Sequence, residues 1–318
     1  MNHLTLDEFR ERSAEYDAAV AATPEISNFC SGALWQLSAH ECIHHVREDS
    51  PHFLVENEGQ WLAFAEKEQE GVYFPFESAW MFGCPLLGDP EQSVVTFLAA
   101  TSRCRQPTGF CIGGVSQEGQ LHAELRKHQS RWRKFQEFPG TDSMRIDLQD
   151  GVEAWLERRS KKFQRTMRNV DSAKGFEIIS ADDASPEDLF QRILRIQKQT
   201  YKWQNGTDIF QIPEYFAFYQ RLLHGLHAAG NLRLLFAKHE GEEVAHILGG
   251  VSGGSYRGLQ MSFVESMRPL GLGNLLQLEN LRRCAAEGIT CYDLGMHSPY
   301  KERWADQRLV SLGFFIVV

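Results

Sequence analysis

Residues 268–274 read RPLGLGN and directly precede a predicted amphipathic helix. Glycines at 271 and 273 let the backbone pass close to a ligand and adopt conformations that a Cβ atom would forbid. The free N–H groups in the first turn of the following helix, with the positive end of its dipole behind them, favour an anion. The pattern indicates a backbone cradle for a pyrophosphate. A tight turn made only for packing has the same spacing.

Two further groups of residues have side chains suited to chemistry. His246 shares a predicted strand face with Val244 and Leu248, so it is either a buried core histidine or a base facing an acceptor cleft. A basic segment is either a solvated helix face or a site for an acidic group, and it contains Arg158, Arg159, Lys161, Lys162, Arg165 and Arg168.

The elements around the glycine loop follow from the period of the apolar residues. Alternation predicts strands over 232–236, 244–251 and 256–264, joined by short turns into an antiparallel meander. The helix after the loop carries Leu275, Leu278, Leu281 and Ala285 on one face, and a strand over 289–294 follows it. Because the loop follows a meander and not the first strand of a βαβ unit, the pattern argues against a Rossmann dinucleotide site.

A domain boundary is predicted near residues 149–151, which divides the chain into domains 1–148 and 149–318. Beyond it, helical spacing from Val152 to Val170 predicts one helix, ended by Gly175. The first domain reads as α+β or α/β, and it contains no motif that we connect with chemistry.

The length, net charge and cysteine content of the chain narrow the class of protein. The chain has 318 residues and a formal charge of -9, which does not favour a general nucleic-acid binder. It has no apolar run long enough to span a membrane, and its N-terminus lacks the order of a signal peptide. Seven cysteines without a CxxC pair indicate reduced thiols and a cytoplasmic location. No metal site is predicted, although the chain has residues of metal-binding types close together at His40, Cys42, His44 and His45.

The order meander, Arg-x-x-Gly-x-Gly, helix and strand resembles the GNAT acyltransferase superfamily, with Arg268, Gly271 and Gly273 matching its signature. More narrowly, the chain is similar to the CelD-like branch. Four stretches carry this likeness, namely 160–168 (SKKFQRTMR), 201–203 (YKW), 241–245 (GEEVA), and 292–295 (YDLG) followed by 300–304 (YKERW).

The resemblance covers about residues 150–305 and implies an α/β GNAT fold, an antiparallel meander followed by the pyrophosphate loop, a helix and a strand. Members of this branch commonly carry a second, degenerate GNAT-like unit in front, so we expect residues 25–145 to form one. This tandem arrangement also resembles Fem-type aminoacyl transferases.

The resemblance also implies site residues. Backbone of the strand before the loop would hold the thioester and pantetheine. Glu265 at the end of that strand and His246 are then candidate bases, Tyr300 is the candidate acid for the leaving thiolate, and His297 is expected to bind the acceptor. Asp293 would be structural or would orient one of them. The expected acyl-CoA contacts are Met261, Phe263, Val264, Arg268, Leu270, Gly271, Leu272, Gly273 and Asn274.

The implied activity is transfer of an acyl group, most simply acetyl, from acyl-CoA to an amine of a small-molecule, sugar or peptide acceptor. One alternative is a Fem-type enzyme that takes an aminoacyl group from tRNA, with the basic segment on the acceptor stem. Another is a non-catalytic module that keeps the fold to bind CoA.

Overall fold

A computed structural model describes residues 1–44, 50–67, 70–171, 175–181 and 184–318. It divides the chain into two compact units, the first formed by Met1–Asp142 with Leu309–Val318 and the second by Ser143–Arg308. This division differs from the predicted domains 1–148 and 149–318 at both ends of the second domain. The strand before residue 149 belongs to the second unit, and the end of the chain belongs to the first.

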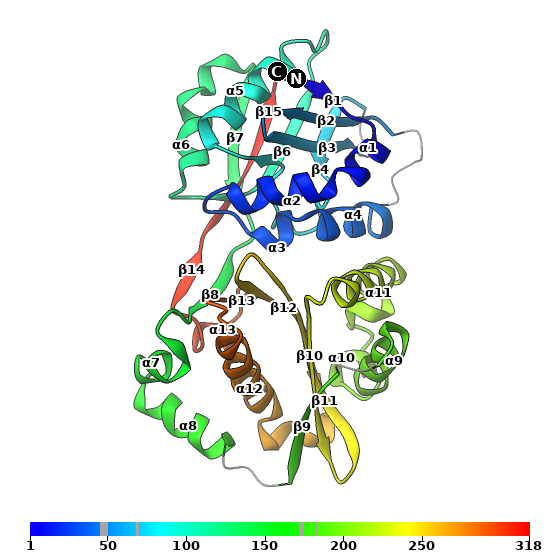
Figure 1. Ribbon diagram of the computed structural model, residues 1–318, viewed down its shortest axis with the longest axis vertical. Coiled ribbons are helices and arrows are strands. Elements are labelled where there is room, and N and C mark those ends of the chain that lie inside the picture. The colour runs from blue at the N-terminus through cyan, green and yellow to red at the C-terminus, as the bar shows by residue number, and fades with distance from the viewer. Residues whose placement is uncertain (45–49, 68–69, 172–174, 182–183) are drawn as a thin grey trace. The chain divides into compact units, whose positions relative to one another are not determined.

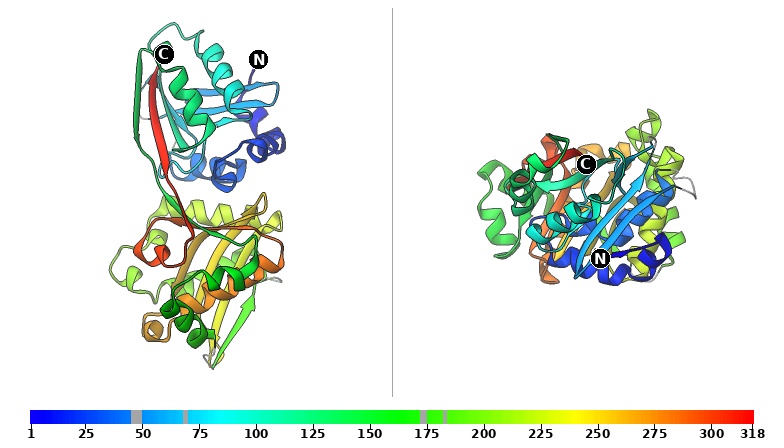
Figure 2. Two further views of the ribbon diagram at one scale, coloured as in Figure 1. Left: turned by 90° about the vertical axis from the view of Figure 1, so that its left-hand side faces the viewer. Right: turned by 90° about the horizontal axis from the view of Figure 1, so that it is seen from above.

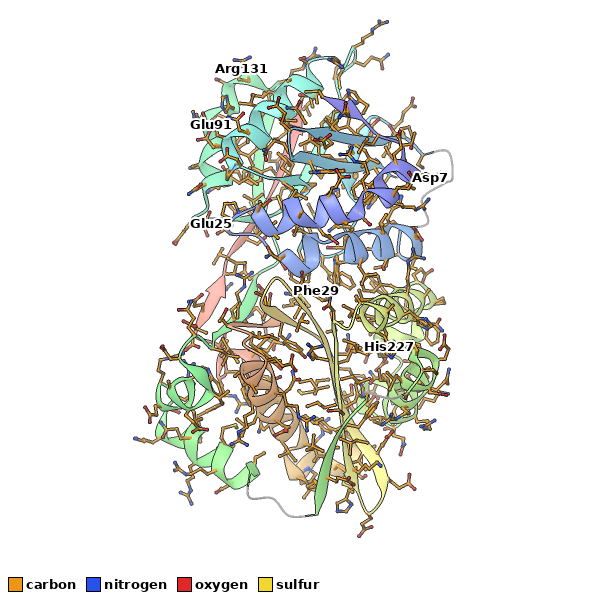
Figure 3. The ribbon with its side chains drawn as sticks, viewed as in Figure 1. Asp7, Glu25, Phe29, Glu91, Arg131 and His227 are labelled. Carbon is orange, nitrogen blue, oxygen red and sulfur yellow. The ribbon has the colours of Figure 1, made fainter. Side chains whose placement is uncertain are left out.

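The first unit is built on a mixed sheet with the order β1-β2-β3-β4-β6-β15-β7, and β5 pairs with β3. Its strands are β1 (Asn2–His3), β2 (His52–Asn57), β3 (Gln60–Glu66), β4 (Val72–Pro75), β5 (Leu86–Leu87), β6 (Gly109–Ser116), β7 (Lys134–Pro139) and β15 (Ser311–Val317). Its helices are α1 (Leu6–Glu11), α2 (Ser13–Ala22), α3 (Asn28–Ser31), α4 (Ala33–Cys42), α5 (Pro90–Thr101) and α6 (Gln120–Lys127). Charged side chains such as Asp7, Glu91 and Arg131 lie on its surface (Figure 3).

The last strand, β15, explains why the domain boundary could not be placed from the sequence. It pairs with β6 on one side and with β7 on the other, both antiparallel, so it completes the first unit's sheet (Figure 2). Phe314 and Ile316 on this strand are fully buried in the first unit's core. The pairing joins residues far apart in sequence, which no local pattern reports.

The second unit carries a sheet with the order β14-β8-β13-β12-β11-β10-β9. Its strands are β8 (Ser143–Asp147), β9 (Phe176–Ser180), β10 (Leu232–His239), β11 (Glu242–Ser252), β12 (Ser255–Phe263), β13 (Cys291–Met296) and β14 (Gln307–Leu309). Its helices are α7 (Gly151–Glu157), α8 (Lys161–Asp171), α9 (Pro186–Gln197), α10 (Tyr201–Gln204), α11 (Pro213–Ala228), α12 (Leu272–Ala286) and α13 (Pro299–Glu302). Within this unit, α7, α8 and α12 lie on one face of the sheet, and α9 to α11 lie on the other (Figure 1).

The predicted meander is confirmed. Strands β10, β11 and β12 pair antiparallel in sequence order, and the helix and strand expected after the glycine loop follow as α12 and β13. β13 then pairs parallel with β12, but only over three residue pairs, from Ser255↔Cys291 to Arg257↔Asp293. Register shifts occur next to this point in both strands, so β12 and β13 separate beyond it.

Buried hydrogen bonds fix α12 against the two separating strands. The hydroxyl of Tyr292 on β13 accepts from Gln277 Nε2 at 2.5 Å and from Asn280 Nδ2 at 2.6 Å, both on α12. The ring of Tyr292 stacks on Tyr256 of β12 with centroids 4.2 Å apart. Since all four side chains are buried, the position of the α12 N-terminus relative to β12 is closely determined.

The predicted single helix from Val152 to Val170 is wrong, because the structure has two helices there. α7 ends at Glu157, and the side-chain oxygen of Ser160 accepts the N–H of Phe163 at 3.2 Å, so a new helix begins. Arg158 and Arg159 in the break are directed to the carboxylate of Asp306. In the described parts of the chain, no helix combines the length and apolar character needed to cross a membrane.

Candidate functional site

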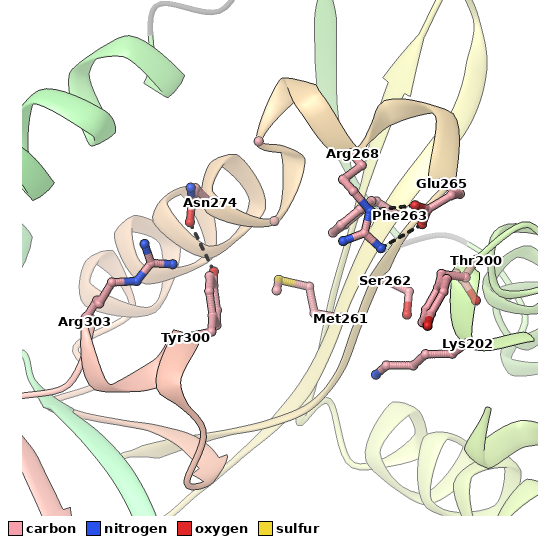
Figure 4. A pocket seen from close by; sticks show the side chains of 13 residues that line it. Thr200, Lys202, Met261, Ser262, Phe263, Glu265, Arg268, Asn274, Tyr300 and Arg303 are labelled. Carbon is pink, nitrogen blue, oxygen red and sulfur yellow. Dashed lines mark hydrogen bonds and ion pairs between the residues drawn. The ribbon is translucent and has the colours of Figure 1, made fainter. Parts of the chain in front are cut away.

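The second unit contains a pocket of about 550 Å³ at the N-terminal end of α12. Its walls come from the end of β12, the glycine loop, α10 and α13 (Figure 4). Of the predicted acyl-CoA contacts, the lining includes Met261, Phe263, Arg268, Gly271, Gly273 and Asn274. The structure therefore brings most of these residues together around one cavity.

The N-terminus of α12 is available to an anion. Gly271 holds a left-handed conformation with φ 69°, and no side chain caps the helix. The N–H groups of Leu272 and Gly273 come before the first intrahelical bond, which Asn274 N–H makes to the carbonyl of Gly271 at 2.9 Å. Two donors and the positive end of a 15-residue helix dipole therefore point towards the pocket end of α12.

Gly273 packs closely against side chains of β12. A Cβ atom at this position would lie 3.2 Å from Met261 Cε and 3.8 Å from Phe263 Cε1. Leu272, in contrast, is 1% exposed and packs into the core, and Leu270 is 47% exposed. Neither of these two side chains lines the pocket, so any contact they make with a ligand is through the backbone.

The separating strands leave an open edge on β12. Beyond Arg257 the ladder shows no further pairs between β12 and β13, so backbone groups near Met261 and Phe263 are available to a ligand. Val264 is an exception, because its N–H already donates to the carbonyl of Val244 at 2.8 Å. This N–H is therefore not free for the acyl-CoA contact that was expected at Val264.

The two faces of β12 contribute different side chains to the pocket. Met261 and Phe263 face α12, while Ser262 points to the opposite face, because successive side chains on a strand alternate. On that opposite side the lining is completed by Thr200 and Lys202, and the Lys202 side chain extends into the pocket (Figure 4). The pocket thus has an apolar side next to the glycine loop and a polar side next to α10.

Glu265 lines the pocket but is held in an ion pair. Its carboxylate takes two hydrogen bonds from Arg268, at 2.6 and 2.9 Å. These bonds hold the pKa of Glu265 below its usual value. A carboxylate stabilised in this way accepts a proton less readily, which weakens its candidacy as a base. Arg268 in turn lies over the rings of Tyr201 and Phe263.

Tyr300 lies where an acid for the thiolate was expected. It follows β13 on the short helix α13, lines the pocket, and its hydroxyl donates to Asn274 Oδ1 at 3.4 Å. Burial raises the pKa of the phenol, so it keeps its proton at neutral pH. The guanidinium of Arg303 lies 5.7 Å from the centroid of its ring.

The two histidines named as site residues lie away from the pocket lining. His246 is fully buried on β11, opposite Ser262, and burial lowers its pKa to about 3. Both of its ring nitrogens lack a hydrogen-bond partner among the described residues. His297 Nε2 instead lies 2.6 Å from Glu302 Oε1. The geometry therefore supports the buried-core interpretation of His246 and gives His297 a partner outside the pocket.

Asp293 has a structural role. It forms a buried ion pair with Arg257 at 2.8 Å and accepts the N–H of Gly295 at 2.7 Å, at the point where β12 and β13 separate. Nearby, Lys301 donates to the carbonyl of Met296 at 2.9 Å. Burial, together with the Arg257 charge, lowers the pKa of Lys301 to about 8.

Sequence reasoning did not assign roles to Thr200, Lys202, Ser262 and Arg303, which all line the pocket. Lys202 and Arg303 occur in stretches that carry the family resemblance, and this was the only signal in the sequence. Thr200 and Ser262 are ordinary hydroxyl residues whose positions depend on strand register and helix packing.

The basic segment borders a second, smaller cavity of about 320 Å³ on the α12 side. Arg158, Arg159 and Lys162 line it, together with Asn274 and Arg303, which also line the first pocket. On α8, the side chains of Lys161, Lys162, Arg165 and Arg168 are exposed. Their charges point outward or towards this cavity, which keeps both interpretations of the segment open.

The residues with metal-ligand types near position 40 do not form a metal site in the described structure. His40 Nε2 lies 3.0 Å from His52 Nε2, and His44 Nε2 accepts the N–H of Ser78 at 3.1 Å. His45 lies outside the described residues. Elsewhere in the described chain, no three His, Cys, Asp or Glu side chains converge as metal ligands.

Solved structures with the same architecture extend over nearly the whole chain. FemX matches with a TM-score of 0.70 and 10% identity, covering 98% of this chain and 97% of its own. A conserved protein of unknown function from Bacteroides thetaiotaomicron VPI-5482 matches with a TM-score of 0.64 and 14% identity, covering 100% and 99%. The C-terminal domain of a putative lysylphosphatidylglycerol synthetase from Agrobacterium fabrum gives 0.58 and 13%, covering 96% and 92%. At these identities the likeness shows the fold alone.

The sequence itself identifies the family. No curated protein matches the chain significantly. The family model described as an acetyltransferase (GNAT) domain matches residues 127–302, which is more than half of the chain. This range contains the meander, the glycine loop, α12, β13 and Tyr300. The chain therefore belongs to the GNAT acetyltransferase family, with a tandem GNAT-like fold.

Proposed function

We propose that the second unit transfers an acyl group, most simply acetyl, from acyl-CoA to an amine. The observation that carries the proposal is the uncapped, glycine-led N-terminus of α12 beside the open edge of β12, within one pocket. The N–H groups of α12 suit a pyrophosphate, and an open strand edge suits the amide groups of pantetheine. Acyl-CoA carries these two groups in sequence along one molecule.

The proposed chemistry needs few side chains. The amine nitrogen attacks the thioester carbonyl carbon, the carbon–sulfur bond breaks, and the departing thiolate takes a proton from the Tyr300 phenol. The phenolate then regains a proton from solvent, to which the amine loses one. Orientation by the pocket supplies much of the rate enhancement, because it makes the attack effectively intramolecular. The support for Tyr300 is its place in the pocket and the retained proton.

We assign removal of the amine proton to solvent, because neither candidate side chain is suited to accept it. Glu265 faces the pocket but is paired with Arg268, and His246 is fully buried away from it. Neither side chain combines access to the pocket with a pKa near neutrality. We therefore place the loss of the proton on water. Of the two candidate bases, only Glu265 has access to the pocket.

We also propose the chemical class of the acceptor. A small-molecule, sugar or peptide amine fits a pocket with one polar and one apolar side. The proposal also includes membership of the CelD-like branch, which the four sequence stretches support, and a cytoplasmic location, which seven cysteines without a CxxC pair support.

One observation favours the Fem-type alternative, in which the acyl donor is an aminoacyl-tRNA. The exposed cations of α8 lie beside the cavity that adjoins the pocket, where a polyanion could bind. Such binding would weaken steeply with salt, whereas binding of a small cofactor would change little. A non-catalytic CoA-binding module would bind acetyl-CoA and show neither hydrolysis nor transfer.

Isothermal titration of acetyl-CoA, together with thiol release in the presence of amines, tests the proposal. Gly271→Val fills the anion cradle and should weaken acetyl-CoA binding at least about tenfold, since a helix N-terminus contributes up to ~2 kcal/mol to an anion. Gly288→Val is the matched control, because Gly288 follows the other end of α12 with a similar φ of 79° and open space around it. Both variants carry the same backbone strain. Equal loss of affinity in both, or none in either, would overturn the donor assignment.

A further inference from the structure

A third cavity, of about 240 Å³, adjoins the main pocket on the side of β12 that faces away from α12. It lies between the end of α9, the segment 207–209 and β12, and it is lined by Gln197, Lys202, Thr207, Asp208, Ile209 and Gln260. Lys202 lines both cavities. Gln260 and Ser262, two residues apart on β12, share the strand face that connects them.

At the inner end of this cavity, one buried acceptor has no donor among the described residues. Gln197 is 1% exposed, and its Nε2 donates to Asp208 Oδ2 at 2.5 Å. This bond fixes the orientation of the amide, because its oxygen cannot face a carboxylate. Gln197 Oε1 is consequently buried with no partner among the described residues. Buried acceptors are nearly always paired in folded proteins, so a bound group with an N–H or O–H is expected here.

The charge at this end agrees with that expectation. Asp208 is also 1% exposed, and its other oxygen accepts the N–H of Phe210 at 2.9 Å. Gln260 is engaged as well, since its Nε2 donates to the hydroxyl of Tyr219 at 3.0 Å. The carboxylate and the free amide oxygen together make the inner end favour a donor or a cation over an anion.

The mouth of the cavity has the opposite preference. Lys202 is exposed and forms no ion pair with any described residue. Its ammonium lies in the main pocket, where the single carboxylate, Glu265, is already paired with Arg268 (Figure 4). A negatively charged group of a ligand is the partner that this ammonium lacks.

We propose that this cavity is the acceptor's specificity subsite and that it selects an amine bearing both a carboxylate or phosphate, paired with Lys202, and a second hydrogen-bond donor, bound by Gln197 Oε1. The inference rests on the proposed acyl transfer, since the reacting amine must reach the thioester in the main pocket. Lys202 and Gln197 are positioning residues here, and neither takes part in proton transfer.

L-lysine and its truncated relatives test the two contacts on the full chain. Cadaverine is lysine without the carboxylate, 6-aminohexanoate is lysine without the second amino group, and the phosphonate analogue replaces the carboxylate. Titration calorimetry without acetyl-CoA should give lysine or its phosphonate an affinity at least about tenfold above that of cadaverine, the effect of one charge-assisted contact. 6-Aminohexanoate should also bind more weakly than lysine. The tighter of the two anionic probes identifies the anion.

Lys202→Met should abolish the preference for the anionic probe over cadaverine, and Lys198→Met, an exposed lysine at the end of α9, should keep it. The truncated ligands examine Gln197 without altering the protein, so a variant that fails to fold does not decide the result. Equal affinities for lysine and cadaverine, or a preference that survives in Lys202→Met, would overturn the subsite. If acetyl-CoA fails to bind while the Lys202-dependent preference is present, the donor assignment is wrong and the subsite stands.

Discussion

Each unit contains a crossover in which a helix connects two parallel strands, and the two crossovers differ at the N-terminus of that helix. In the first, β4 leads through the short strand β5 and the helix α5 to β6, which pairs parallel with β4. In the second, β12 leads through α12 to β13, which pairs parallel with β12. The N-terminus of α5 is closed by Asp89, whose side chain accepts the N–H of Gln92 at 3.0 Å, and Pro90 removes a further N–H. The N-terminus of α12 has no such cap.

This difference shows how one fold can keep or lose an anion site. A carboxylate at the N-cap satisfies the helix dipole and the free N–H groups from within the chain, so an external phosphate gains little there. Two glycines leave the same positions free for a ligand. The first unit is therefore stabilised at a place where the second is left open for binding.

The largest expected effect concerns the proposed acid of the second unit, Tyr300. The segment after β13 supplies Tyr300, whereas the residues after β6 are Gln117, Glu118 and Gly119. Tyr300→Phe should lower kcat at least about tenfold, within the range typical of a positioned acid, with acetyl-CoA affinity near wild type. Steady-state kinetics and calorimetry measure the two quantities. Full turnover in the variant would return protonation of the thiolate to solvent.

A smaller effect is expected from the basic helix of the second unit. Arg165→Gln with Arg168→Gln should raise the KM of one substrate by roughly threefold to tenfold, because an exposed contact to phosphate contributes about 1 kcal/mol. The melting temperature should change little, since both side chains are exposed. Unchanged KM values for donor and acceptor would support the interpretation of this segment as a solvated helix face.

The variant Asp89→Ala tests whether the cap on α5 stabilises the first unit without affecting ligand binding. Loss of the cap should cost about 1 kcal/mol in the free energy of unfolding, while acetyl-CoA affinity stays unchanged. Asp89→Asn keeps a capping oxygen and is the matched control. Chemical denaturation gives the first quantity and calorimetry the second. A change in acetyl-CoA affinity on removing Asp89 would mean that the first unit also takes part in binding.

The smallest expected effect is on the pH dependence of the rate. His246 has a pKa lowered to about 3, so its imidazole is neutral in the folded protein at any pH near neutrality. Its titration therefore cannot produce the acidic limb of the pH–rate profile. The pKa of Glu265 is lowered too. Glu265→Gln and His246→Phe should therefore both keep the acidic limb of the kcat/KM profile. Disappearance of that limb in one variant would identify its residue as the base.

The local features of the second unit can be read from the sequence alone. The alternation in β10 to β12, the turns between them and the glycine loop before α12 are encoded in neighbouring residues, and the structure confirms them. Residues close in sequence act together through turn chemistry and side-chain period, which can be read without a fold. The family likeness rested on the same local segments.

Contacts between residues far apart in the sequence depend on the tertiary structure. β15 returns to the first unit, Arg159 pairs with Asp306, and the hydroxyl of Tyr300 donates to Asn274. Strand register buries His246 and turns Ser262 towards Lys202. Such outcomes depend on register and helix packing, which are set by the summed burial of many side chains, so no local pattern specifies them.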